Sequence, residues 1–222
     1  MAGRDYHQFC GVARAFEIIG APWAGLIIRD LILGPKRFAD LVELLPRATE
    51  AELTERLGEL ETAGVVVRSG AGGDAVCELT GYGKDLEPIL LPLGRWGARS
   101  LGDPRPGDLF SMDMAILALR ATFRPERAHG VRASFEVRFG ELVVTATVDD
   151  GELTVSEGGH TDADVVVDTP FLRRLMADEL SPTDALWLGL IEPKGDPAKL
   201  NTFVELFHIP PAPDRPDDEY VA

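Results

Sequence analysis

Several features are scarce in this sequence of 222 residues, and each scarcity argues against a class of protein. Only two cysteines occur, Cys10 and Cys77, so we expect no disulfide framework and a reducing, cytoplasmic setting. No apolar run approaches the roughly 18 residues that a membrane span needs. The four histidines are scattered, so the sequence predicts no metal site. No phosphate-binding loop, nucleophile elbow or carboxylate pair occurs, so no catalytic residue and no cofactor are predicted.

Positive charge is scarce as well. The chain carries 22 Lys and Arg against 37 Asp and Glu, a formal net charge of −15. Residues 1–103 have 11 basic against 15 acidic side chains, and the remainder has 11 against 22. Because phosphate contacts supply much of the affinity of DNA-binding proteins, this composition argues against a strongly basic DNA-binding surface and leaves only a local patch.

The chain reads as two halves around a short connecting segment. Residues 102–108 concentrate Pro, Gly and Asp between two apolar patterns, which is typical of a linker. We therefore expect one domain over residues 1–101 and a second over 109–209. The tail, 210–222, holds four prolines and four acidic residues with little to bury, and is expected to be flexible.

The first half has the pattern of a small helical domain with a hairpin. Apolar residues recur at helical spacing in three short segments, and these are Phe9, Val12, Ala13, Phe16 and Ile19; Trp23, Leu26, Ile27 and Leu31; and Phe38, Leu41, Leu44 and Leu45. Thr49 and Glu52 have the spacing of a capping box that begins a fourth helix, which Gly64 would end. Residues 65–68 and 75–79 predict a hairpin. Thr80 is expected to cap one more helix, with an apolar stripe of Leu86, Leu90, Leu93 and Trp96.

This order of three helices, a capped fourth, a hairpin and a last helix predicts a winged helix-turn-helix.

In the second half the spacing of the apolar residues changes, and the pattern predicts an α+β domain. A helix is expected over 114–123, and strands are expected over 131–139, 142–148, 152–156 and 164–168. Helices at 170–178, 182–190 and 197–207 follow. We expect a meander that forms an antiparallel sheet, with the helices enclosing an apolar pocket.

With these residues in view, the first half resembles the HxlR family of winged helix-turn-helix regulators over residues 6–101. The resemblance is carried by residues 8–15, 23–33, 34–41 and 53–57, and by Leu79-Thr80 with Gly83. It implies a homodimer paired through terminal helices, with the helix after the turn in the major groove of double-stranded DNA. On that basis the predicted DNA-binding residues are Lys36, Arg37, Thr54, Arg56 and Arg68.

The sequence departs from the family where DNA would be read. An asparagine common in the family is replaced by Ala51, and the basic residue expected after Leu57 is Gly58. Between Thr49 and Thr62 there are five glutamates and one arginine. The scaffold is therefore retained while its reading surface is acidic.

The second half resembles the sterol-carrier-protein-like lipid-binding fold over residues 110–208. Residues 148–155, 163–167, 182–189 and 195–200 carry the resemblance, together with Phe203 and Phe207. It implies a sheet whose helices enclose an apolar tunnel. The predicted ligand-binding residues are Phe171, Met176, Trp187, Leu190, Phe203 and Phe207, and a filled core is the alternative for the same stripes.

Two functions fit these patterns. The first is a ligand-responsive regulator in which an apolar small molecule in the second domain alters how the dimer sits on DNA. The second is a former regulator that no longer binds DNA and that carries, sequesters or transforms an apolar metabolite, as a cyclase-like enzyme would. Cys10 lies where some HxlR relatives keep a redox-sensing thiol, and a buried structural cysteine is the alternative.

Overall fold

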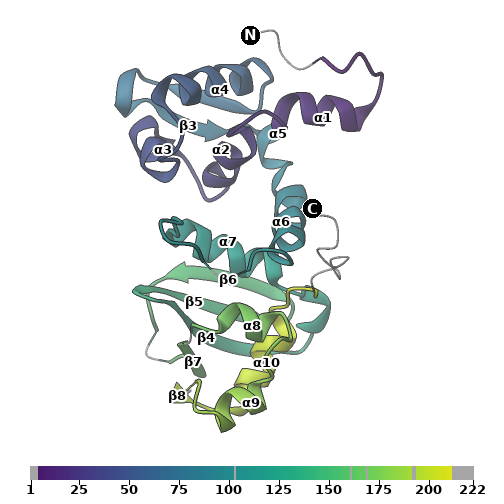
Figure 1. Cartoon of the computed structure of the whole chain (residues 1–222), viewed down its shortest axis with the longest axis vertical. Helices are drawn as coiled ribbons and strands as arrows, with labels where there is room; N and C mark the ends of the chain where they lie inside the picture. The colour runs from purple at the N-terminus through teal and green to yellow at the C-terminus, as the bar shows by residue number, and fades with distance from the viewer. Residues whose placement is uncertain (1–4, 103, 161, 169, 192–193, 212–222) are drawn as a thin grey trace, which may run out of the picture. The chain divides into compact units, whose positions relative to one another are not determined.

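The computed structural model of the protein describes residues 5–102, 104–160, 162–168, 170–191 and 194–211. The chain divides into two compact units, Met1–Leu90 and Leu91–Ala222, each with its own sheet (Figure 1). Within the described ranges, no single helix has the length and apolar character of a membrane span. Helices α1 (Gly11–Ile19) and α2 (Ala24–Leu31) pass that test only as a pair bent by 82°. The predicted flexible tail lies, from residue 212 on, outside the described residues.

The first unit combines helices with a small antiparallel sheet. After α1 and α2 come β1 (Lys36–Arg37), α3 (Phe38–Leu44), α4 (Glu50–Thr62), β2 (Val66–Ser69), β3 (Val76–Leu79) and α5 (Gly81–Lys84). The sheet order is β1-β3-β2, and a short 3-10 turn, η1 (Gly72–Asp74), lies in the loop between β2 and β3. The predicted hairpin, hereafter the wing, is confirmed by the pairing of Val66 with Leu79 and of Ser69 with Val76.

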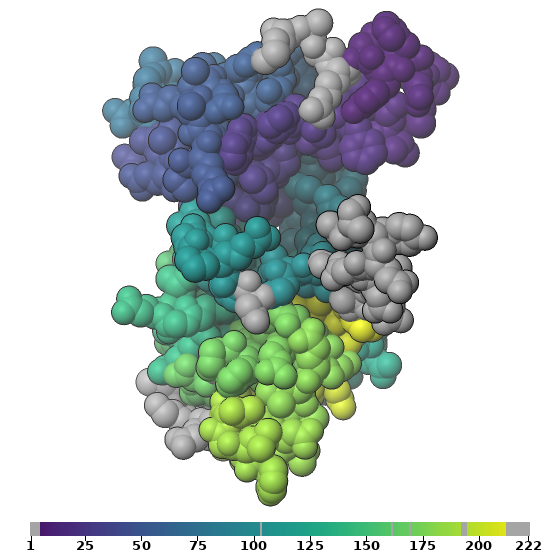
Figure 2. Space-filling view, in the orientation of Figure 1, coloured from purple at the N-terminus to yellow at the C-terminus, as the bar shows by residue number. Residues whose placement is uncertain are grey.

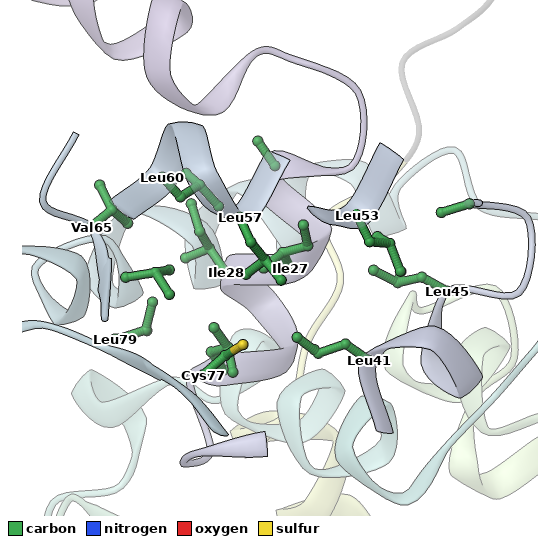
Figure 3. Packing of buried hydrophobic residues seen from close by; sticks show 14 residues of the cluster. Ile27, Ile28, Leu41, Leu45, Leu53, Leu57, Leu60, Val65, Cys77 and Leu79 are labelled. Carbon is green, nitrogen blue, oxygen red and sulfur yellow. The ribbon is translucent and has the colours of Figure 1, made fainter. Parts of the chain in front are cut away.

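The core of the first unit is formed where α2, α3, α4 and the wing meet (Figure 3). Its fully buried large side chains are Ile27, Ile28, Leu31, Leu41, Leu53, Leu57 and Leu60. Burying each such side chain stabilises the fold by about 1.5–3 kcal/mol. The stripe predicted on α2 is wrong at Leu26, which is exposed, because the helix turns Ile28 inward instead.

Local capping chemistry fixes the ends of these helices. The Thr49 hydroxyl accepts the N–H of Glu52, and the Glu52 carboxylate accepts the N–H of Thr49, so the predicted capping box is confirmed. Gly64 follows α4 with a φ of 73°, as expected of a residue that ends a helix. Thr80 caps α5, but that helix ends at Lys84 and α6 (Glu87–Ala98) begins separately, with the division between the units falling inside α6.

Helix α1 differs from its neighbours because its apolar face is not buried in the chain. Ala13 is buried, whereas Phe9, Val12 and Phe16 are exposed. The space-filling view shows the atoms of this region, in purple, as a projecting part of the first unit (Figure 2). An apolar helix face of this kind is typical of a protein interface.

The second unit contains α7 (Met112–Thr122), a 3-10 turn η2 (Pro125–Arg127), β4 (Arg132–Phe139), β5 (Leu142–Asp149), β6 (Glu152–Glu157), β7 (Val165–Asp168), α8 (Leu172–Met176), α9 (Pro182–Trp187), β8 (Lys194–Gly195) and α10 (Ala198–Leu206). The mixed α+β content is as predicted. The sheet order is β6-β5-β4-β7-β8.

The prediction of an antiparallel meander is wrong for β7, which returns to pair in parallel with β4. The register joins Phe135 to Val165 and Val137 to Val167, so both valines share a face with Phe135. All four side chains are fully buried. If β7 paired with β6 instead, at the edge of the sheet, its valines would not lie next to the buried side chains of β4. The burial that β7 and β4 share is a physical reason for the crossover.

Candidate nucleic-acid interface and candidate apolar-ligand site

The candidate reading helix is α4, which follows the turn after α3. Its inward side chains Leu53, Leu57 and Leu60 fix the helix on the core, and its capping box fixes where it begins. The residues it leaves exposed are Glu50, Ala51, Glu52, Thr54, Glu55, Glu59 and Thr62. This exposed face contains four carboxylates and no basic residue, so it would repel phosphate groups rather than attract them.

Arg56 is the one basic residue of α4, and the structure does not place it on that exposed face. Its side chain is only 13% exposed and pairs with Glu59 one turn along the helix. The Arg56 Nε is buried and has no acceptor among the described residues. Thr54, in contrast, is exposed and is the predicted DNA-binding residue of α4 that faces solvent.

The other predicted phosphate contacts are also next to carboxylates. Arg37 binds Asp40 through two nitrogens, with Nη2 2.6 Å from Oδ1 and Nε 3.1 Å from Oδ2. This hydrogen bonding lowers the pKa of Asp40 and raises that of Arg37. Arg68 Nη2 lies 2.9 Å from Glu61 Oε2. Lys36, in β1, is half-buried, and its charge also favours the ionised form of Asp40. Any DNA phosphate would compete with these internal partners.

A groove separates the helices from the wing, and we call it the wing groove. It has a volume of about 710 Å³ and lies between α3, the beginning of α4, and the loop of residues 69–74. Its apolar lining comes mainly from Phe38, Val42, Ala71 and Ala75, and its carboxylates are Glu43 and Glu50. Sequence reasoning did not find this site, because its residues come from separate elements and form no motif.

Cys10 is exposed, directly before α1. The backbone N–H groups of Ala13 and then Val12 lower the pKa of its thiol, because they stabilise the thiolate at the helix N-terminus. Cys77 differs: it is buried in β3, and burial raises the pKa of its thiol. Of the two thiols, Cys10 is therefore the more exposed, and its pKa is lowered where that of Cys77 is raised.

The structure brings together only some of the predicted ligand-binding residues. Phe203 and Phe207 are fully buried, with ring centroids 4.8 Å apart, and Phe135 of β4 lies 5.4 Å and 6.0 Å from them. Met176 is buried, while Phe171 and Leu190 are half-buried. Trp187 is 83% exposed at the end of α9 and does not belong to this cluster.

One polar arrangement in the second unit was not predicted. Glu136, on β4, is buried on the sheet face opposite Phe135, and its Oε1 accepts from Nε and Nη2 of Arg138 at 2.8 and 2.7 Å. Gly159 packs so closely that a Cβ there would lie 2.3 Å from Glu136 Oε2. The Thr145 hydroxyl donates to the carbonyl oxygen of Gly158 at 2.8 Å. The loop after β6 therefore covers part of this face, and its glycine pair was the only signal in the sequence.

Three helices, a capped reading helix and a two-stranded wing define the first unit as a winged helix-turn-helix. In agreement with this, the HxlR-like helix-turn-helix family matches residues 18–104. The chain is 36% identical over 98 residues to YdeP, an uncharacterized HTH-type transcriptional regulator of Bacillus subtilis (strain 168), covering 43% of this chain and 77% of that protein. The chain belongs to the HxlR family.

Two further similarities are to HTH-type transcriptional regulators. YtcD, another uncharacterized HTH-type transcriptional regulator of Bacillus subtilis (strain 168), is 38% identical over 104 residues, which cover 46% of this chain and 82% of that protein. The crystal structure of quinone-bound YodB from B. subtilis is 35% identical and covers 39% of this chain and 93% of that chain, with a TM-score of 0.36. The resemblance of residues 110–208 to sterol-carrier-like proteins stays a prediction.

Proposed function

We propose that this protein is a dimeric, DNA-binding transcriptional regulator of HxlR type whose response is set by an apolar small molecule held in residues 109–209. The observation that carries the proposal is the intact winged-helix scaffold, with a capped α4 on a filled core and a paired wing. The compact units divide between Leu90 and Leu91, so the linker predicted at 102–108 falls within the unit that would hold the ligand.

The affinity for DNA is expected to be low and steeply dependent on salt. The exposed face of α4 has no cation, and Arg37, Arg56 and Arg68 each have an internal carboxylate partner. A mobility-shift assay with DNA from upstream of the protein's own gene tests this, at about 50 mM and then about 200 mM salt. Retardation at the lower salt only is the expected result. Nanomolar binding to a defined operator at the higher salt would contradict it.

A variant that restores the residues usual in the family makes this experiment more specific. Ala51→Asn with Gly58→Lys returns the two residues usual in the family, and a Cβ at Gly58 meets no atom within 4 Å. We expect this pair to strengthen binding about tenfold or more, since an added hydrogen-bonding residue and a cation would then face the DNA. Gly81→Lys is the matched control, because it adds the same charge at an equally open glycine of α5, outside the helices assigned to dimerisation. An equal gain from both would mean that charge alone, at any position, is responsible.

For the apolar ligand, we propose a site next to the buried phenylalanine cluster, with entry at the end of α9. Trp187 and Leu188 are exposed there, and Phe171 and Leu190 are half-buried. Helices α9 and α10 are in contact, so a ligand that reaches Phe203 and Phe207 must part them. Medium-chain fatty acids are suitable probes, because their apolar tail suits this surface.

Trp187 gives this proposal a direct signal. A bound apolar probe should shift Trp187 fluorescence to shorter wavelength and raise the melting temperature of the protein. Trp187→Ala should weaken the response, while Trp23→Ala, in the other unit, should leave it unchanged. A melting temperature that stays constant up to millimolar probe would contradict an apolar site in this unit.

The alternative is a former regulator that uses the same scaffold only to hold or transform an apolar metabolite. The specific observation in its favour is the acidic exposed face of α4 described above. No DNA retardation at any salt, together with the Trp187-dependent fluorescence shift, would establish this alternative. Retention of both activities supports the ligand-responsive regulator.

A further inference from the structure

The wing groove has the chemistry of a small-molecule site that is separate from the apolar-ligand site and borders the candidate DNA interface, since Thr54 and Arg68 also line it. Phe38 and Val42 are half-buried, Ala75 is buried, and all three line the groove. Glu43 and Glu50 are exposed and make no hydrogen bond or ion pair with the described residues. The groove thus combines apolar surface with two carboxylates that have no short-range partner.

The single cation in the lining does not cancel this charge. Arg68 is paired with Glu61 at 2.9 Å, so its charge is already balanced on the side of α4. Arg37, which interacts at longer range with Glu43, is bound by Asp40. The charge that remains for an occupant of the groove is therefore negative.

The shape of the groove limits the size of that occupant. The wing loop approaches α3, because a Cβ at Gly73 would lie 3.8 Å from the Cβ of Ala39. This contact bounds the groove on one side. Its volume of about 710 Å³ lies within the range of about 300–1,000 Å³ that is usual for small-molecule sites.

From this combination we propose that the wing groove binds an amphipathic organic cation, a small molecule with an apolar body and a permanent positive charge. The apolar body contacts Phe38, Val42 and Ala71, and the charge lies between Glu43 and Glu50. Anions and phosphate-rich polymers are disfavoured by the same two carboxylates.

Rhodamine 6G and fluorescein form a matched pair of probes, because they share a xanthene core and carry opposite charge. Fluorescence anisotropy of rhodamine 6G with the full chain is expected to show saturable binding that weakens as salt is raised. Glu43→Gln and Glu50→Gln should each weaken it about two- to fivefold, since each removes one partly exposed charge contact. Ala71→Trp, which fills the groove, should abolish it.

The controls separate this site from the others. Glu141→Gln removes the same charge from an exposed turn of the second unit and should leave rhodamine 6G binding unchanged. Trp187→Ala should also leave it unchanged, which distinguishes the groove from the proposed apolar-ligand site. Equal affinity for fluorescein, or unaltered rhodamine 6G binding in the Glu43→Gln, Glu50→Gln double variant, would overturn the proposal. Carboxylate-dependent binding of an octalysine peptide without binding of rhodamine 6G would also overturn it, in favour of a basic protein segment.

Discussion

The two thiols of this chain occupy opposite environments. Cys10 is exposed at the start of α1, and backbone N–H groups lower its pKa; Cys77 is buried among the core side chains in Figure 3, and burial raises its pKa. Nucleophilic attack requires the thiolate, so the thiol with the lower pKa and the greater access reacts first. This contrast favours Cys10 over Cys77 as the redox-sensing thiol that the sequence suggested, and that role stays a prediction.

Alkylation by iodoacetamide tests that proposal. Because the pKa of Cys10 lies below its ordinary value, the thiolate fraction at pH 7 is larger than for a free thiol, and the rate should reach its plateau at a lower pH. Cys10→Ser should remove the fast reaction and leave only Cys77, which should react after denaturation. Mass spectrometry of the labelled peptides measures both rates. A pH profile for Cys10 that matches a free cysteine would contradict the prediction.

The candidate DNA interface shows which features of a site can be predicted from the sequence and which cannot. Lys36, Arg37, Arg56 and Arg68 were predicted from residue type and position in the helix-turn-helix. Their partners were not, because Arg68 and Glu61 lie on different elements, and the pairing depends on how the wing packs against α4. The same limit applies to Trp187, whose stripe indicated burial while the structure leaves it exposed.

At the scale of elements, local chemistry made the first unit predictable. The Thr49 and Glu52 box, Gly64 and Thr80 act over three or four residues, so the sequence shows them directly. The break between α5 and α6 was missed, and so was the close packing of α5 on the residue before β2. A Cβ at Gly83 would lie 2.1 Å from the carbonyl oxygen of Val65, so glycine is needed there. The parallel pairing of β7 is equally non-local.

The capping box allows a prediction for α4. Thr49→Ala removes the hydroxyl that accepts the N–H of Glu52, and should lower the free energy of unfolding of the first unit by about 1 kcal/mol. Thr62→Ala is the matched control at the other end of the helix, where the hydroxyl only donates to the Gly58 carbonyl, and should change it by less than about 0.5 kcal/mol. Urea denaturation followed by Trp23 fluorescence, with Trp96 and Trp187 replaced by Phe, measures both. Equal losses in the two variants would show that the cap contributes nothing specific.

At the scale of the whole molecule, exposed apolar side chains occur on both terminal helices of the winged-helix domain, α1 and α6, which the family resemblance assigns to dimerisation. On and before α1 it comprises Tyr6, Phe9, Val12 and Phe16, and on α6 it comprises Ile89, Leu93 and Trp96. Leu86 and Leu90, from the same predicted stripe, pack against the first core instead. The predicted stripe therefore has two parts. Its first part packs within the chain, and its later part, Leu93 and Trp96, is available to a second copy of the chain.

We expect the protein to be a homodimer, and α1 to contribute to the interface. Phe9→Ser with Phe16→Ser should weaken the dimer more than tenfold, because burial of each phenylalanine is worth about 2 kcal/mol. Trp187→Ser removes an exposed aromatic ring from the second unit and should leave the dimer intact. Light scattering at micromolar concentration distinguishes the states. A monomeric wild-type protein would remove this prediction.

The position of α10 has a consequence for how the chain is made. Phe203 and Phe207 complete the buried cluster around Phe135, yet they lie some 70 residues later in the chain. The ribosome delivers the chain from its N-terminus, so the winged helix can fold as soon as residues up to about 90 have emerged. The sheet must wait with its central strand uncovered until the last helix is released. A nascent chain stalled before residue 198 would thus carry a folded winged helix followed by an incompletely folded second unit with exposed apolar surface. Such surface is a substrate for chaperones.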